Sequence, residues 1–210
     1  MFLVFLSAYA VGFSGAVMPG PLLTYTVRKS LAVGPKAGYI IIAGHALLEL
    51  ALVTVIFLGF DAVLKSGTAQ TVIGFAGGVL LSLMGADMIV SSVRNKVSVK
   101  TGAGESGTKN MMLASVILTA SNPYFIIWWA IIGLGFIMQA YGSFGFAGVA
   151  VYYAGHIAAD LTWYALVSTV VGKTRKFIGE KTYRIIILCL GFLLVFFGIR
   201  FFTGALSGVL

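Results

Sequence analysis

Two pairs of ionisable side chains lie inside long apolar stretches of the sequence. His45 and Glu49 are four residues apart. His156 and Asp160 have the same spacing, which places two side chains on one face of a helix. An ionised side chain at the bilayer centre costs about 2.5–3.5 kcal/mol on insertion scales, and a buried carboxyl group avoids part of this by taking a proton. The pairs predict that Glu49 and Asp160 carry protons, with the histidines as partners or relays; a structural hydrogen bond between helices is the alternative.

Two proline motifs interrupt apolar stretches that would otherwise read as helices. Proline in a helix interior removes one hydrogen bond and clashes with the carbonyl of residue i−4, and in lipid the freed carbonyls need another partner. A broken helix therefore exposes backbone groups and dipole ends to a substrate. We predict a substrate site at these breaks, with simple kinks and core packing as the alternatives. Its predicted residues are Pro19, Gly20, Pro21, Asn122, Pro123 and Trp128.

The composition of the chain indicates a membrane protein. Of the 210 residues, 60% are hydrophobic and only 10% are charged, and the mean hydropathy is +1.04. Soluble domains carry about 25% charged residues, so an ordinary soluble enzyme, a disordered chain and a nucleic-acid module are all excluded. The single cysteine, Cys189, excludes an internal disulfide and a cysteine-based metal cluster.

Six stretches are long enough to cross a bilayer, which takes about 20 apolar residues of helix. They are continuously apolar, unlike the alternating strands of a membrane barrel. The sequence therefore predicts an all-α membrane protein with six transmembrane helices, folded as one transmembrane domain over residues 1–210. The predicted spans are residues 3–27, 37–60, 69–92, 111–138, 143–171 and 183–206.

The basic residues predict the orientation of these spans. Twelve of the 14 lysines and arginines fall within three loops, at residues 28–36, 94–109 and 173–184, and only Lys65 and Arg200 fall elsewhere. Cytoplasmic loops of membrane proteins carry an excess of lysine and arginine. We therefore predict a multi-pass protein of the cell membrane with both termini outside.

The two halves of the chain resemble each other. Ala-Gly-His at 43–45 with Glu49 matches Ala-Gly-His at 154–156 with Asp160, at an offset of 111 residues. Glycines of the third and sixth spans match at an offset of 113. Each half has three spans, so the second copy would enter the membrane upside down, as in the inverted repeats of secondary transporters. We predict repeat one at about 1–93, a cytoplasmic linker at about 94–110 and repeat two at about 111–210. The alternative is that two sequences built from few apolar residue types match by chance.

The same residues are compatible with other functions. Histidine and carboxylate side chains bind divalent cations, so export of a divalent metal is a rival to transport of a small organic molecule. A passive channel or a membrane assembly partner is a rival of another class. The sequence has no nucleotide-binding P-loop and no catalytic signature. We expect no enzymatic activity, no cofactor, no resident metal and no nucleic-acid partner.

Three motifs resemble the LysE/RhtB superfamily of amino-acid exporters. The stretch GFSGAVMPGP at residues 12–21 is similar to the family's signature in its first helix. The stretch GPKAG at 34–38, together with Gly44-His45, is similar to the continuation of that signature into the second helix. Ser-Asn-Pro at 121–123 is similar to the family's Asn-Pro motif in the fourth helix. The resemblance covers nearly the whole chain. The family often has lysine after Asn-Pro, where this sequence has Tyr124.

This resemblance implies export of amino acids or related small metabolites, driven by the proton gradient, and a homodimer. Combined with the residues above, it predicts a site between the two breaks in which half-helix ends hold the carboxylate and amine of a zwitterion. Glu49 and Asp160 would alternately face each side, binding protons outside and releasing them inside. The lipid bilayer, protons and a small-molecule substrate are the expected partners.

Overall fold

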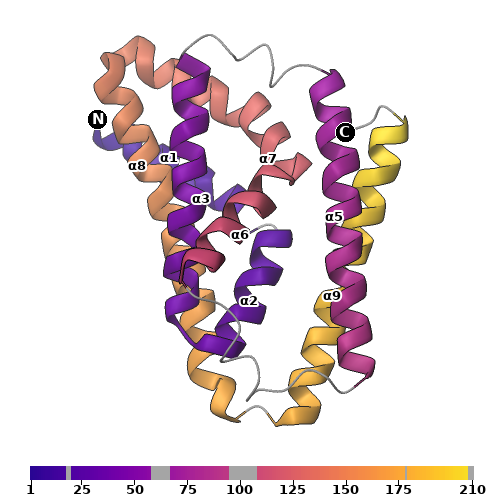
Figure 1. The fold of residues 1–210 in the computed structure, drawn as a ribbon. Helices are drawn as coiled ribbons and strands as arrows, with labels where there is room; N and C mark the ends of the chain where they lie inside the picture. The colour runs from indigo at the N-terminus through magenta and orange to yellow at the C-terminus, as the bar shows by residue number, and fades with distance from the viewer. Residues whose placement is uncertain (18–19, 58–66, 95–107, 178, 208–210) are drawn as a thin grey trace.

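The computed structural model describes residues 1–17, 20–57, 67–94, 108–177 and 179–207, and within these ranges it contains helices and no strand (Figure 1). The predicted all-α class is confirmed for these residues. In chain order the elements are α1 (Phe2–Ala16), α2 (Pro21–Val33), α3 (Lys36–Val55), α5 (Gly67–Val93), α6 (Thr108–Ala120), α7 (Pro123–Trp128), a π-helical turn (Trp129–Gly133), α8 (Leu134–Thr174), a 3-10 turn (Arg175–Phe177) and α9 (Glu180–Ser207).

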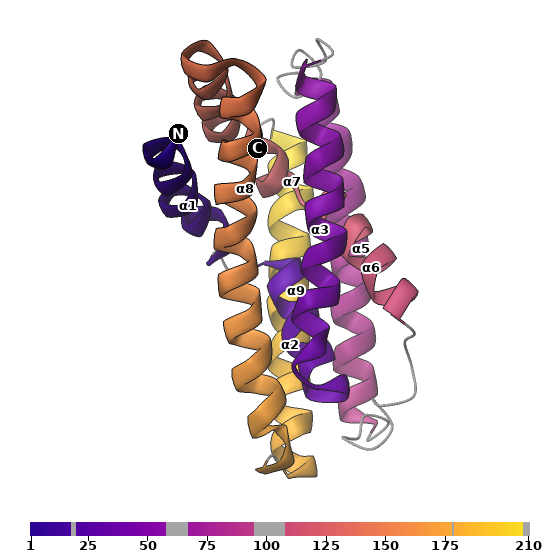
Figure 2. The same cartoon turned by 90° about the vertical axis from the view of Figure 1, so that its left-hand side faces the viewer.

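Four described helices are long and apolar enough to cross a membrane. They are Lys36–Val55, Gly74–Val93, Leu134–Phe177 and Glu180–Ser207. A fifth span is present if α1 and α2, which are bent by 79° relative to each other, count as one broken span. In Figure 2 the long helices α3, α5, α8 and α9 run along one common direction. Six separate spans therefore remain a prediction.

The predicted fourth span differs from the structure. Residues 111–138 are divided among α6, α7, the π-helical turn and the beginning of α8. The separation predicted at residues 139–142 lies a few residues further along the chain, because residues 139–142 are helical and α8 consists of two helices that meet at a kink at Gly145. That residue has φ 60° and ψ −149°, a conformation that only glycine adopts readily. Lys65 and most of the predicted linker lie outside the described residues.

Both predicted helix breaks are present. Helix α1 ends at Ala16, and α2 begins at Pro21 after an extended Gly20. A proline in the first turn is tolerated because its missing N–H would have no helical partner there. In the other half, α6 ends at Ala120 and Asn122 is the N-cap of α7, its side-chain oxygen accepting a hydrogen bond from the Tyr124 N–H at 3.1 Å.

The helices that follow the breaks lie inside the bundle. Helices α2 and α7 are seen between α3 and the pair formed by α5 and α9 (Figure 1). Helix α2 contacts α3, α8 and α9, and α7 contacts α5. Helix α8 also packs against α1 and α3. The broken helices are thus surrounded by the long ones, which positions their exposed ends within the protein.

Candidate functional site

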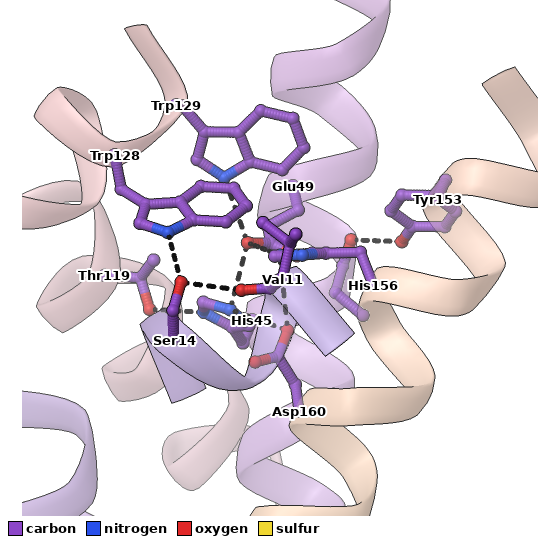
Figure 3. A network of polar contacts seen from close by, with 11 residues as sticks. Val11, Ser14, His45, Glu49, Thr119, Trp128, Trp129, Tyr153, His156 and Asp160 are labelled. Atoms are coloured by element: carbon purple, nitrogen blue, oxygen red, sulfur yellow. Dashed lines mark hydrogen bonds and ion pairs between the residues drawn. The ribbon is translucent and has the colours of Figure 1, made fainter. Parts of the chain in front are cut away.

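The four ionisable side chains predicted from the sequence meet between two helices. His45 and Glu49 come from α3, and His156 and Asp160 come from α8. All four are buried, with exposed fractions between 1% and 8%. Figure 3 shows that the two pairs, predicted separately from the sequence, lie together in one cluster.

Each histidine faces both acids. His45 Nε2 lies 3.2 Å from Glu49 Oε1 and 3.6 Å from Asp160 Oδ2. His156 Nε2 lies 3.2 Å and 3.5 Å from the same two oxygens. The sequence predicted contacts within each helix, at i and i+4, but the contacts across the two helices required the packing of α3 against α8.

Two further side chains complete the cluster. The indole N–H of Trp129 donates a hydrogen bond to Glu49 Oε1 at 3.1 Å, and Thr119 Oγ1 lies 3.0 Å from His45 Nδ1 (Figure 3). Glu49 Oε1 therefore has three nitrogens within 3.2 Å. Sequence reasoning missed both partners. The signals that the sequence offered were Thr119 as a polar residue within an apolar helix, and Trp129 as the neighbour of the predicted site residue Trp128.

Some polar atoms of the cluster lack a hydrogen bond. Among the described residues, Glu49 Oε2, Asp160 Oδ2 and His156 Nδ1 have no hydrogen-bond partner although all three atoms are buried. A buried acceptor without a donor destabilises a protein by about 1–3 kcal/mol. Such atoms are therefore candidates for contact with a ligand.

A cavity of about 230 Å³ lies beside the cluster. All four ionisable residues line it, and so do Thr119 and Trp129. Of the residues predicted to bind substrate, Gly20, Asn122 and Trp128 line the same cavity. The structure thus brings both helix breaks and the acid–histidine cluster to one place. Pro21 is buried in the first turn of α2, Pro123 begins α7, and Pro19 lies outside the described residues.

Trp128 is held in place from two sides. Its indole N–H donates a hydrogen bond to Ser14 Oγ of α1 at 3.2 Å (Figure 3). Its ring lies over the ring of His156, with centroids 4.8 Å apart. Trp128 therefore connects the first broken helix to the ionisable cluster.

Comparison with known proteins agrees with this arrangement. The sequence model of the LysE type translocators matches residues 13–205. The chain belongs to the LysE type translocator family. This confirms the resemblance expected from the Pro-Gly-Pro and Asn-Pro motifs, and it makes the chain a multi-pass membrane transporter.

Two relatives of this LysE translocator are distant. The chain is 23% identical to the chemotactic transduction protein ChpE of Pseudomonas aeruginosa over 78% of this chain and 79% of that protein. It is 24% identical to the leucine efflux protein of Enterobacter sp. strain 638, over 61% of this chain and 62% of that protein. No solved structure matches the chain.

The geometry of this LysE translocator suits the binding of cations. Carboxylate oxygens from two helices converge on one cavity, and protons, ammonium groups or metal ions are the species that such oxygens attract. One ligand atom from each of His45, Glu49 and Asp160 lies within 4.8 Å of the other two. A cavity lined by acids at helix breaks within a membrane bundle is the arrangement expected of a transport site.

Proposed function

We propose that this protein is a secondary transporter that exports amino acids or related small metabolites from the cytoplasm in exchange for protons. The observation that carries the proposal is the buried acid–histidine cluster beside a cavity at two helix breaks. Intramembrane acids mark ion and proton pathways. The relative named as a leucine efflux protein supports an amino-acid cargo.

The exchange follows from competition for the same atoms. A proton and the ammonium group of an amino acid both need the lone pairs of Glu49 or Asp160. Binding of one therefore weakens binding of the other by the same factor, as linkage requires. Cargo would leave the acids on the outside as protons bind, and protons would leave on the inside as new cargo binds.

We further propose that the halves are inverted repeats that alternate access to the site. Support comes from the packing of α5 against α9. A Cβ added to Gly78 would lie 2.8 Å from Gly198 O, and one added to Gly85 would lie 2.6 Å from Gly191 O. The repeat offset of 113 residues pairs Gly78 with Gly191 and Gly85 with Gly198. A two-fold axis between the helices would exchange these two contacts.

A second pair of contacts supports the same axis. A Cβ added to Gly44 of α3 would lie 2.5 Å from Met112 O of α6, and one added to Gly155 of α8 would lie 2.5 Å from Phe5 O of α1. Gly44 and Gly155 are equivalent at an offset of 111, and an axis that exchanges these contacts would relate Phe5 to Met112, an offset of 107, whereas Pro21 and Pro123 are 102 residues apart. Rocking of one repeat against the other would expose the cavity to each side in turn.

Orientation and assembly are part of the proposal. The basic loops favour an orientation with both termini outside the cell membrane, by the positive-inside rule, and the family resemblance implies a homodimer. Reporter fusions at each terminus test the orientation, and cross-linking in native membranes tests the dimer. A cytoplasmic terminus, or a monomer at every degree of cross-linking, would contradict these two points.

The transport proposal is tested in proteoliposomes with an imposed pH gradient. Vesicles loaded with a mixture of amino acids are followed by mass spectrometry. We expect gradient-dependent loss of particular amino acids from vesicles with the unaltered protein, no loss with Glu49→Gln, and a loss about tenfold slower with Asp160→Asn. Glu180→Gln, which alters an exposed acid in the first turn of α9, is the matched control and should export normally. Equal export by all variants would overturn the proposal.

Export of a divalent metal is the second candidate, with the metal as cargo. It is favoured by the convergence of ligand atoms from His45, Glu49 and Asp160. Calorimetric titration of the purified protein with Mn²⁺ and Zn²⁺ distinguishes the candidates. Stoichiometric binding that is lost in His45→Ala, together with metal flux in vesicles, would favour the metal.

A further inference from the structure

Among the described residues that line the cavity, the side chains other than histidine that carry charge are acids, and His45 and His156, which pair with these acids, are cations only when protonated. Among the described residues that line it, Glu49 and Asp160 are acids and none is lysine or arginine. A carboxylate in this cavity would lie beside two acids and would find no permanently charged cation on a side chain. Since like charges repel in a low-dielectric interior, these two acids disfavour an anion close to them.

The same acids have acceptor atoms to offer. Glu49 Oε2 and Asp160 Oδ2 have no hydrogen-bond partner among the described residues, and the two residues are 1% and 3% exposed. A protonated primary amine brings three N–H donors and no acceptor. Such a group has a donor for each of these oxygens, and the two carboxyl groups come from α3 and α8, which pack against each other.

The rest of the lining suits an apolar body. Leu22, Leu23, Phe125, Ile127 and Ile132 supply aliphatic and aromatic surface, which favours burial of apolar ligand groups. Two tryptophans, adjacent in sequence, line the cavity beside the acids. The face of an indole ring attracts an ammonium group within about 6 Å of its centre.

We infer that the cavity selects its ligand by one ammonium group on an apolar body, and that the carboxylate of an amino acid adds little to binding. The inference rests on the proposed transport function, and it narrows the cargo to two related classes of compound. These are amino acids with apolar side chains and the monoamines with the same carbon skeletons. Acidic ligands are rejected by Glu49 and Asp160.

Three compounds that share a branched apolar skeleton test this inference. Leucine has both charged groups, 3-methylbutylamine keeps only the amine, and 4-methylpentanoate keeps only the carboxylate. Binding of each to the purified full-length protein is measured by calorimetry and by the shift in thermal unfolding. We expect leucine and the amine to bind with dissociation constants within about tenfold of each other, and no binding of the carboxylate at the same concentrations.

Two variants separate recognition from partitioning of the amine into detergent. Glu49→Gln should lose binding of both leucine and 3-methylbutylamine, because it removes the charge beside the free oxygen. Glu180→Gln should bind both as the unaltered protein does, because Glu180 is exposed at the start of α9, away from the cavity. If the heat measured on adding the amine is equal for the unaltered protein, Glu49→Gln and Glu180→Gln, the amine is partitioning into detergent. That result would count against the inference.

The outcomes separate this inference from the transport proposal. Binding of 4-methylpentanoate, failure of the amine to bind while leucine binds, or no binding of leucine and the amine would overturn the inference. If the amine binds and depends on Glu49, but neither it nor leucine leaves vesicles in response to a pH gradient, the inference stands and the proposed antiport fails.

Discussion

The two histidines of the site face the same pair of acids but are held by different neighbours. His45 Nδ1 lies 3.0 Å from Thr119 Oγ1 of α6. In the proposed repeat the position equivalent to Thr119 is Gly12 of α1, at the offset of 107 that also relates Phe5 to Met112. A Cβ added to Gly12 would lie 3.0 Å from His156 Nδ1, an atom that has no hydrogen-bond partner among the described residues.

The difference shows how a symmetric cluster is supported asymmetrically. His45 is oriented by a hydroxyl group, whereas His156 is oriented by close packing against α1 and by neighbouring aromatic rings. The ring of Trp128 lies 4.8 Å from that of His156, and the ring of Tyr152 stacks on it at 6.3 Å with an interplanar angle of 9°. The four ionisable residues follow the proposed two-fold relation, whereas the neighbours that orient the two histidines do not.

The largest expected effect comes from changing the acids, which are also unequal. Glu49 Oε1 has three nitrogens within 3.2 Å, while Asp160 Oδ2 has histidine nitrogens only at 3.5 and 3.6 Å. Hydrogen bonds to a charged group contribute about 1.5–3 kcal/mol each. We expect Glu49→Gln to abolish export and Asp160→Asn to reduce it by about tenfold, as measured by initial efflux rates. Equal loss in both variants would show that the two acids are equivalent.

A smaller effect, on stability, is expected at Gly12. Valine there would place a side chain against His156 Nδ1 and Ala159 Cβ, which an added Cβ would approach to 3.0 and 3.1 Å. Overpacking of this kind costs about 1–3 kcal/mol, so Gly12→Val should lower the midpoint of thermal unfolding in detergent.

The matched control is Gly135→Val. Gly135 lies in α8, and an added Cβ there would meet nothing within 4 Å. This variant should unfold at nearly the same temperature as the unaltered protein. An equal decrease in both variants would attribute the effect to valine in a helix and not to the packing of α1 on His156.

The smallest effect is expected at Thr119. Valine has nearly the same shape as threonine but lacks the hydroxyl group, so Thr119→Val removes the hydrogen bond to His45 Nδ1. A neutral hydrogen bond contributes about 0.5–1.5 kcal/mol, and we expect the efflux rate to decrease about threefold to tenfold. Thr119→Ser keeps the hydroxyl group and should restore the rate. Failure of serine to do so would point to a role of the methyl group in packing.

Much of the site could be predicted because its residues are chemically unusual in their surroundings. Acids and histidines within apolar helices, and prolines within helix interiors, stand out without any knowledge of packing. That reasoning singled out His45, Glu49, His156 and Asp160 as two pairs, and it placed both helix breaks.

Other features depended on tertiary structure and could not be read from the sequence. Thr119 became a partner of the cluster because α6 packs against α3, and Trp129 because the π-helical turn packs against α8 with its indole N–H directed at Glu49. The end of the fourth span was misplaced by a few residues because both Gly142 and Gly145 favour a break, and only the structure shows that the kink lies at Gly145. Pairing across α3 and α8 likewise depends on how these helices meet.

The most direct test of the central claim, that cargo and protons compete for Glu49 and Asp160, is proton release on binding. Leucine is added to the purified protein in weakly buffered solution, and the pH is followed with an indicator dye. Our account predicts that binding releases protons from the unaltered protein and from Glu180→Gln, and that the Glu49→Gln, Asp160→Asn double variant releases none. Leucine binding without proton release at any pH between 5 and 8, the range in which histidines and perturbed acids titrate, would contradict it.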